Sequence, residues 1–259
     1  TALEIQRGDL DLAIITGGEA WRSRMRARAA GVELHWPKAP ADRMPRTSGE
    51  DLEMNHPAER AQGIALPVQV YPMFETAIRA AAGRTVQEQQ QVAGGLWARF
   101  SEVAAANPNA WLREARTAEE IVTPTAKNRM IGFPYTKSMV SNNDVDMAAA
   151  VIMCSVAKAE ALGVPRDRWV FPHSGTDCHE HNFISNRWSF AETPAVELGG
   201  RHALELAGLG VDDIEVIDLY SCFPSAVQLG AKSLGLSLDR QLTRTGGLAF
   251  AGGPWNNYV

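Results

Sequence analysis

Two segments of the chain contain residue types that can carry out chemistry. The first begins with residues 211–223 (VDDIEVIDLYSCF), which read as a strand ending at Tyr220 and Cys222. It continues to residues 245–259 (TGGLAFAGGPWNNYV), where an apolar run lies between two Gly-Gly turns. A phenol hydroxyl can donate a hydrogen bond, so Tyr220 is a candidate for a role in chemistry. Alternatively, Tyr220 is only a half-buried aromatic side chain at a strand end.

The second segment is residues 177–181 (DCHEH), which lie close to a further histidine, His173. Cysteine and histidine bind metal ions, but tetrahedral sites normally combine two separated pairs of ligands. The other histidines, His35, His56 and His202, are isolated, so the chain offers no second pair. We expect no metal site and interpret the run as a polar loop at a subunit contact or at the rim of a pocket. A second pair outside this chain would restore the metal hypothesis.

The elements that position these residues begin near the amino terminus. Apolar residues ahead of Gly8 indicate the last turn of a helix, and residues 10–16 (LDLAIIT) predict a buried strand. Gly17 and Gly18 lack a GxGxxG pattern or a Walker lysine, and so predict a tight turn rather than a phosphate site. Residues 21–28 (WRSRMRAR) predict a basic helix or loop. Because the chain starts inside a helix and stops just after a Gly-Gly-Pro loop, we expect it to be an internal piece of a longer polypeptide.

The middle of the chain predicts a surface excursion followed by helices. Residues 35–72 are rich in Pro, Asp, Arg and Gly, whereas residues 73–82 and 86–106 carry apolar residues at helical spacing. The clearest helical pattern starts after Asn143-Asp144 and closes at Gly163. One face of this predicted helix contains Ala148, Val151, Ile152, Ser155, Val156 and Ala159, and Cys154 reads as a small buried side chain beside it.

Short strands and helices alternate toward the carboxyl terminus. The pattern predicts a strand at residues 169–172, a helix that begins at Thr193-Pro194 and ends near residue 207, a strand at 211–219 and a helix at 224–234. Helices that alternate with buried strands indicate an α/β protein with layered sheets.

The composition is that of a globular protein. With 259 residues, 45% hydrophobic and 21% charged, the chain can form one large domain or two small ones. A formal net charge of −5 provides no basic field for nucleic acid, and no apolar run is long enough to cross a membrane. Three cysteines without a CxxC pair argue against a disulfide framework, so we expect a cytoplasmic location.

Four motifs, taken in order, give the chain a family resemblance. They are Gly17-Gly18-Glu19, TKSMVSNNDVDMAAAVIM at 136–153, LYSCF at 219–223 and GGLAFAGGP at 246–254. This series resembles the thiolase superfamily, in particular the branch near sterol-carrier-protein thiolases and proteins labelled acetyl-CoA acetyltransferases. The resemblance implies two similar βαβαβαββ halves in a layered α/β/α/β/α fold with mixed sheets and a long loop and helical insertion.

The same resemblance divides the chain into three parts. Residues 1–34 would be the remainder of the amino-terminal half, and residues 35–131 the loop and helical insertion. Residues 132–259 would contain the rest of that half and the start of an incomplete carboxyl-terminal half.

The resemblance also implies how the site is altered. Thiolases use a nucleophilic cysteine, a histidine that activates it, a second cysteine and an oxyanion hole, and both cysteines would lie outside this chain. The Gly-His-Pro motif falls on residues 252–254, so Gly253 replaces the histidine. The His-Asp-Cys-Phe loop falls on residues 220–223, so Tyr220 replaces a second histidine. Met147 stands in for the glycine of the Asp-Gly-Ala-Ala-Ala signature.

Site residues follow by position in these motifs. The catalytic candidates are Tyr220, Cys222, Asn256 and Asn257, and the candidates for binding CoA are Ser141, Asn142, Gly247, Gly252 and Gly253. The amides of Asn256 and Asn257 can polarise a carbonyl but cannot take a proton at neutral pH. A CoA thioester would be the substrate, and no resident cofactor is expected.

Three functions remain open. The first is an acyltransferase of the acetyl-CoA acetyltransferase type, acting on CoA thioesters of fatty acids or sterol side chains. The second is a non-catalytic thiolase-fold protein that binds CoA or an acyl group, or pairs with another subunit. The third is a lyase in which Tyr220 transfers a proton. A homodimer or a partner subunit is an expectation from the family.

Overall fold

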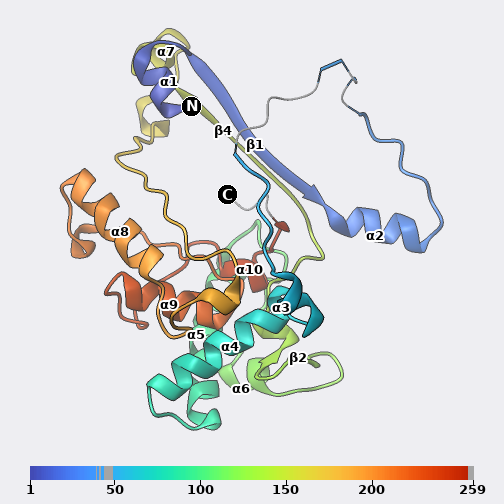
Figure 1. Ribbon diagram of the computed structural model, residues 1–259. Coiled ribbons are helices and arrows are strands. Elements are labelled where there is room, and N and C mark those ends of the chain that lie inside the picture. Colours follow the sequence, from blue (N-terminus) through green and yellow to red (C-terminus); the bar gives the residue numbers. More distant parts are fainter. Residues whose placement is uncertain (39, 41, 44–48, 256–259) are drawn as a thin grey trace.

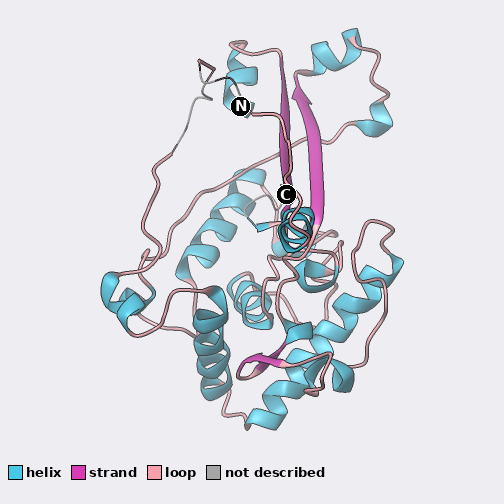
Figure 2. Cartoon of the chain, turned by 90° about the vertical axis from the view of Figure 1, so that its right-hand side faces the viewer, coloured by secondary structure: helices cyan, strands magenta, loops and turns pink. Residues whose placement is uncertain are grey.

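The computed structural model describes residues 1–38, 40, 42–43 and 49–255. A helical body carries a long two-stranded ribbon that extends away from it (Figure 1). Helices α1 (Ala2–Arg7) and α7 (Val156–Ala161) lie at the far end of the ribbon, and α2 (Trp21–Ala29) starts where the ribbon comes back toward the body. The two strands stay side by side in the view turned by 90° (Figure 2).

The ribbon corrects the prediction of a helix after Asn143-Asp144. Strand β1 (Leu12–Ala20) pairs antiparallel with β4 (Asp146–Cys154), so residues 146–154 are a strand and α7 begins only after Ser155. The apolar residues of β4 do have helical spacing, but Val151 and Ile152 lie opposite Ile15 and Ile14. Pairing of β-branched side chains across the strands outweighs that local periodicity. Cys154 therefore ends a strand and is partly exposed, not buried in a helix.

The amino-terminal elements mostly agree with the sequence. Helix α1 ends at Gly8, whose φ of 80° is the left-handed conformation expected of a closing glycine. The basic helix at residues 21–28 is α2. The predicted turn at Gly17 and Gly18 is wrong, because both glycines lie inside β1 opposite Ala149 and Ala148.

The body is organised around α5 (Val86–Ala106), whose predicted bounds are confirmed. Thr85 Oγ1 accepts a hydrogen bond from the Glu88 N–H, and the Glu88 carboxylate accepts one from the Thr85 N–H, which fixes the first turn. Two of its apolar residues, Leu96 and Phe100, are buried in the core. Helix α4 (Pro67–Ala81) starts earlier than the predicted residue 73 and contains Pro72.

Shorter elements surround α4 and α5. They are α3 (Pro57–Ala61), α6 (Ala118–Val122), and the paired strands β2 (Met130–Gly132) and β3 (Tyr135–Thr136). Both sheets within the described residues are antiparallel pairs. None of the helices in these residues has the length and apolar character needed to span a bilayer.

The carboxyl-terminal helices were predicted, but the strands between them were not correct. Helices α8 (Pro194–Ala207) and α9 (Pro224–Ser233) match, and the short α10 (Gly247–Phe250) follows. Residues 169–172 form no strand, because Val170 and Phe171 are exposed (90% and 57%) rather than buried in a sheet. Residues 211–213 are a 3₁₀ turn, and the stretch to Leu219 forms no ladder with a neighbouring strand among the described residues.

A buried carboxylate joins four elements of the body. Glu75 of α4 accepts hydrogen bonds from Gln89 of α5, from Gln228 of α9 at 2.9 Å and from the Tyr135 hydroxyl of β3 at 2.6 Å. The Tyr135 hydroxyl also lies 2.8 Å from Ser225 Oγ at the start of α9. Burial, and then the charge of Glu75, raises the pKa of Tyr135. The network places the first turn of α9 against α4.

Candidate functional site

Three loops that are distant in sequence meet just before α9. The Ser141 N–H donates to the Cys222 carbonyl at 3.0 Å, and the Asn142 N–H donates to the Leu248 carbonyl at 3.0 Å. The Gly253 N–H in turn donates to the Asn142 carbonyl at 2.9 Å. The structure therefore brings together Ser141, Asn142, Cys222 and the two glycine-rich turns, which the sequence had placed in one site.

Gly253 fits only because it has no side chain. A Cβ at this position would overlap Ser141 Oγ and would lie 3.2 Å from Asn143 Oδ1. Ser141 Oγ donates to Asn143 Oδ1 at 3.0 Å, so the serine is held in that place. The space that a histidine would need at residue 253 is thus filled by Ser141.

The neighbouring glycines make similar close approaches. Gly252 has a φ of 128°, and a Cβ there would press on Met147 and lie 3.0 Å from the Trp111 ring. Gly247 has a φ of 75°, and its Cβ would lie 2.9 Å from Ser221 Oγ, which accepts a hydrogen bond from the Leu248 N–H. Met147 therefore contacts the Gly252 turn from strand β4, not from the helix start that the sequence suggested.

Cys222 is buried beneath these loops, with 4% of its surface exposed. Burial raises the pKa of its thiol to about 11, although hydrogen bonds from the Tyr71 and Tyr220 hydroxyls lower it. At neutral pH the thiol is protonated, and a protonated thiol is a poor nucleophile. Cys222 therefore lies beneath the site as a protonated thiol and is not activated as a nucleophile.

Tyr71 of α4 is a residue of this region that the sequence did not indicate. Its ring stacks on Phe223 with centroids 4.4 Å apart, and its hydroxyl bonds the Cys222 thiol. Burial raises the pKa of Tyr71 far above its usual value. No spacing in the sequence connects a tyrosine inside a helical stretch with residues 222 and 223, so only the structure could reveal it.

Tyr220 lies at the exposed rim of the same region, and 51% of its surface is accessible. Its hydroxyl bonds the Cys222 thiol. A tyrosine in this place can present a hydroxyl to a bound molecule, which Cys222 cannot do with its thiol. Asn256 and Asn257, the other catalytic candidates, lie outside the described residues.

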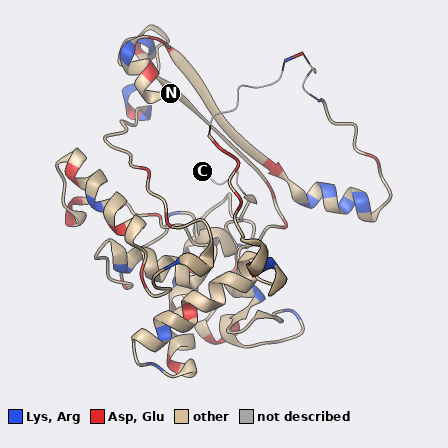
Figure 3. Cartoon of the chain, viewed as in Figure 1, with Lys and Arg blue, Asp and Glu red and all other residues tan. Residues whose placement is uncertain are grey.

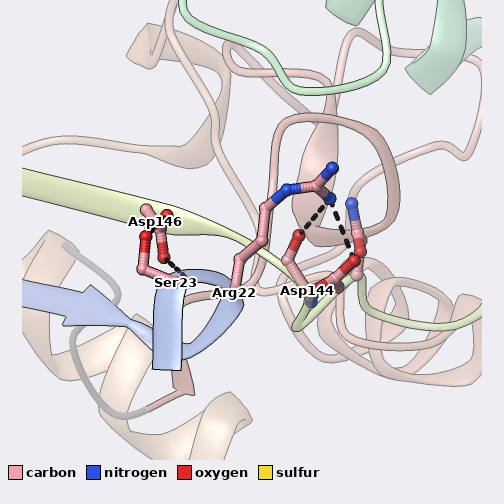
Figure 4. A network of polar contacts seen from close by, with 5 residues as sticks. Arg22, Ser23, Asp144 and Asp146 are labelled. Atoms are coloured by element: carbon pink, nitrogen blue, oxygen red, sulfur yellow. Dashed lines mark hydrogen bonds and ion pairs between the residues drawn. The ribbon is translucent and has the colours of Figure 1, made fainter. Parts of the chain in front are cut away.

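Helix α2 is attached directly to the site. The Trp21 ring meets the Trp255 ring, two residues after Gly253, with centroids 5.5 Å apart. Figure 4 shows the second attachment: Arg22 Nη1 donates to Asp144 Oδ2 at 2.9 Å, while Ser23 donates from its N–H and its Oγ to Asp146 at 3.0 and 2.7 Å.

Asp146 acts as a cap that α2 does not supply itself. The residue before α2 is Ala20, which has no side-chain acceptor, and the strand register places Asp146 directly opposite Ala20. Hydrogen bonding from the Ser23 N–H lowers the pKa of Asp146. The Arg22 guanidinium also lies 5.3 Å from the centre of the Trp111 ring. The first turn of α2 is therefore fixed by residues that adjoin the candidate site.

The DCHEH run lies elsewhere, before α8. Glu180 accepts hydrogen bonds from the Ala195 N–H at 3.0 Å and from Thr193 Oγ1 at 2.9 Å, so it caps α8. His179, His181 and Trp188 line a hollow of about 290 Å³ beside it. Within the described part of the chain, no three or more His, Cys, Asp or Glu side chains are placed to share a metal ion.

No family model matches the chain. A subunit of benzoylsuccinyl-CoA thiolase from Thauera aromatica is 24% identical over 190 residues, which cover 73% of this chain and 44% of that protein. The chain thus spans less than half the length of this curated relative.

Solved structures give a wider match. A monomeric SCP2-thiolase-like protein type 1 from Mycobacterium smegmatis superposes with a TM-score of 0.78 and 32% identity, over 96% of this chain and 48% of that one. An Ltp2–ChsH2(DUF35) aldolase gives a TM-score of 0.66 with 16% identity, over 96% of this chain and 62% of that one.

The dimeric peroxisomal thiolase of Saccharomyces cerevisiae gives a TM-score of 0.55 with 16% identity, over 98% of this chain and 62% of that one. At 16% identity, this thiolase and the aldolase are evidence for the fold alone. The superpositions support the α/β thiolase-like fold expected from the sequence. The likenesses identify the chain as thiolase-like, an α/β chain that resembles SCP2-thiolase-like proteins along nearly its whole length.

Proposed function

We propose that this chain contributes the thioester-binding part of a thiolase-fold protein that acts on CoA thioesters of fatty acids or sterol side chains. The observation that carries the proposal is the meeting of Ser141, Asn142, Tyr220 and the glycine turns at one place. The Nδ2 group of Asn142 donates to no other described residue, so it is a donor that can polarise a thioester carbonyl. Tyr220 lies half exposed at the rim, where its hydroxyl bonds the Cys222 thiol.

Acyl transfer by these residues alone is not part of the proposal. The Cys222 thiol is protonated at neutral pH, and Gly253 has no group that accepts a proton. A nucleophilic cysteine would have to come from outside this chain, as the resemblance to thiolases implies. The acyltransferase activity therefore depends on the longer protein.

The assay that tests acyl transfer is thiolysis of acetoacetyl-CoA by the full-length protein. A rate above background that survives Cys222→Ala supports transfer through a cysteine outside this chain. Absence of any rate, with acetyl-CoA still bound, rejects the transferase and leaves thioester binding. Absence of binding as well contradicts the proposal itself.

A second candidate is a lyase that cleaves a carbon–carbon bond in a CoA ester with Tyr220 as the proton-transferring group. The place of Tyr220 at the half-exposed rim of the site favours it, and one structural neighbour is described as an aldolase. Tyr220→Phe removes only that hydroxyl. Loss of turnover with unchanged CoA ester binding supports the lyase, whereas unchanged turnover rejects it.

A further inference from the structure

We propose that the arginines of α2 bind the phosphate groups of the CoA thioester whose acyl end lies at the candidate site. This inference rests on the proposed function and adds the binding position of the nucleotide end of the ligand. It concerns mainly Arg24, Arg26 and Arg28, because Arg22 is already bound to Asp144.

The charge of α2 is unusual for this protein. The helix contains four arginines in nine residues and no acidic residue, in a chain whose formal net charge is −5. Figure 3 shows the basic residues as blue bands along α2, the helix that follows β1. Arg24 and Arg28 are four residues apart on the same side, where like charges repel.

Among the described residues, no packing contact of α2 explains the cluster. None of its residues is buried, so the helix contributes no side chain to a core. Arg24 lies over the Trp21 ring, with its guanidinium 5.7 Å from the ring centre. Arg26 and Arg28 are exposed, and neither forms an ion pair with another described residue. A bound anion would remove the repulsion and hold the guanidinium groups.

The position of the helix selects the anion. Its first turn is joined to the site by Trp21 on Trp255 and by Ser23 on Asp146. At a rise of about 1.5 Å per residue, Arg28 lies about 8 Å further along the axis than Ser23. The helix thus begins at the expected thioester position and leads its arginines away from it. A CoA thioester has the same arrangement, with a neutral pantetheine arm between the thioester and the phosphates.

Guanidinium groups are suited to this ligand. Their planar fork makes two parallel hydrogen bonds with phosphate oxygens, which a lysine cannot reproduce. An acidic protein surface would also be attracted to the arginines of α2, but nothing would require such a surface to adjoin the thioester site. The adjoining thioester position favours phosphates of the same ligand over a separate partner.

The experiment compares ligands with and without phosphates, using the full-length protein. Isothermal titration measures the Kd of acetyl-CoA, of dephospho-CoA and of S-acetylpantetheine, which has the same thioester but no nucleotide. The test variant is Arg26→Glu/Arg28→Glu, and the conservative variant is Arg26→Lys/Arg28→Lys. The matched control is Lys127→Glu/Arg129→Glu, which makes the same charge change before β2, far from α2 in Figure 1.

The expected result is a selective loss. The charge reversal raises the Kd of acetyl-CoA at least about tenfold, which corresponds to about 1.4 kcal/mol, and leaves S-acetylpantetheine unchanged. The Kd of acetyl-CoA for the lysine variant lies between the values for the wild type and the charge reversal. The control variant changes the Kd of neither ligand. Added salt weakens the binding of the CoA compounds only. Far-UV circular dichroism of each variant shows that the fold is retained.

Two outcomes overturn the inference, and they differ from failure of the proposed function. If the wild type binds both thioesters and the charge reversal leaves acetyl-CoA unchanged, the phosphates bind elsewhere. Poly-glutamate, titrated in the same way, represents an acidic protein. If the charge reversal abolishes only the binding of poly-glutamate, α2 is a surface for acidic proteins. If the wild type binds neither thioester, the proposed function fails, and this inference fails with it.

Discussion

Gly253 shows how the absence of one side chain limits what the site can do. A histidine there would supply the proton acceptor of a thiolase, but Ser141 Oγ already occupies the space of a Cβ. The serine is held by Asn143, so the glycine at residue 253 and the serine at residue 141 belong to one packing arrangement. Restoring thiolase-like chemistry at this position would require both residues to change.

The first prediction follows from that overlap. Gly253→Ala forces Ser141 to move and lowers the free energy of unfolding by about 1–3 kcal/mol. Adding Ser141→Gly removes the obstructing hydroxymethyl group and recovers most of that loss. Urea denaturation of the two single variants and the double variant measures the coupling. Strictly additive effects would contradict the contact.

Cys222 gives the second prediction, because a thiol with a pKa of about 11 reacts slowly at neutral pH. Cys178 is exposed and serves as the internal reference. We expect iodoacetamide to modify Cys178 first and to reach Cys222 only after urea unfolds the chain, as followed by mass spectrometry of the peptides. Equal labelling rates in the native protein would mean that Cys222 is neither buried nor protonated.

At the level of elements, the sequence predicts a helix correctly when the helix contains its own cap and apolar periodicity. It fails when the secondary structure of a segment depends on pairing with a distant part of the chain. Helix α5 has a capping pair at Thr85 and Glu88 and a buried face that follows its period, so its bounds could be read directly. Strand β4 could not, because its partner β1 lies far away in sequence and the local spacing is helical. Likewise Cys222 and Gly253 were found by motif, whereas Tyr71 has no motif.

The attachment of α2 by Asp146 gives the third prediction. Asp146→Asn weakens the charge-assisted cap and lowers the free energy of unfolding at pH 7 by about 1 kcal/mol or less, because the group is near the surface. The folded-state pKa of Asp146 lies below the ordinary 3.8, so its stabilising effect is present above that pH and is lost as the pH falls through the folded-state value.

The measurement is urea denaturation of wild type and variant at pH values between neutral and 3. The difference between them should begin to shrink below about pH 3.8, where Asp146 of the unfolded chain takes up its proton, and should shrink further as the pH approaches the lower folded-state pKa. Asp11→Asn, an exposed substitution at the other end of the ribbon, is the control. A difference that grows toward acid would contradict the sign of the shift.

At the scale of the whole molecule, a body with a polar centre carries a ribbon that contributes little to the core. Glu75 ties together α4, α5, α9 and β3, whereas Ile14, Val151 and Ile152 of the ribbon are more than half exposed. Stability is therefore concentrated in the body, and the ribbon adds mainly its own backbone pairing and the cap on α2.

The fourth prediction tests that distribution. Glu75→Ala leaves buried donors of Gln89, Gln228 and Tyr135 without an acceptor and lowers the free energy of unfolding by about 3 kcal/mol or more. Glu102→Ala, an exposed change on α5, should alter it by no more than about 0.5 kcal/mol. Thermal denaturation followed by circular dichroism compares the two. Similar effects would mean that the network does not join the helices.

The contact between Trp21 and Trp255 gives the protein a built-in optical signal. Trp255 follows the glycine turn of the site, is half exposed and adopts a φ of 53°, which is unusual for a residue with a side chain. Two indole rings 5.5 Å apart and inclined at 61° couple their electronic transitions. Any ligand that displaces the turn changes the angle between them, so near-ultraviolet dichroism and tryptophan emission report occupancy without an added label.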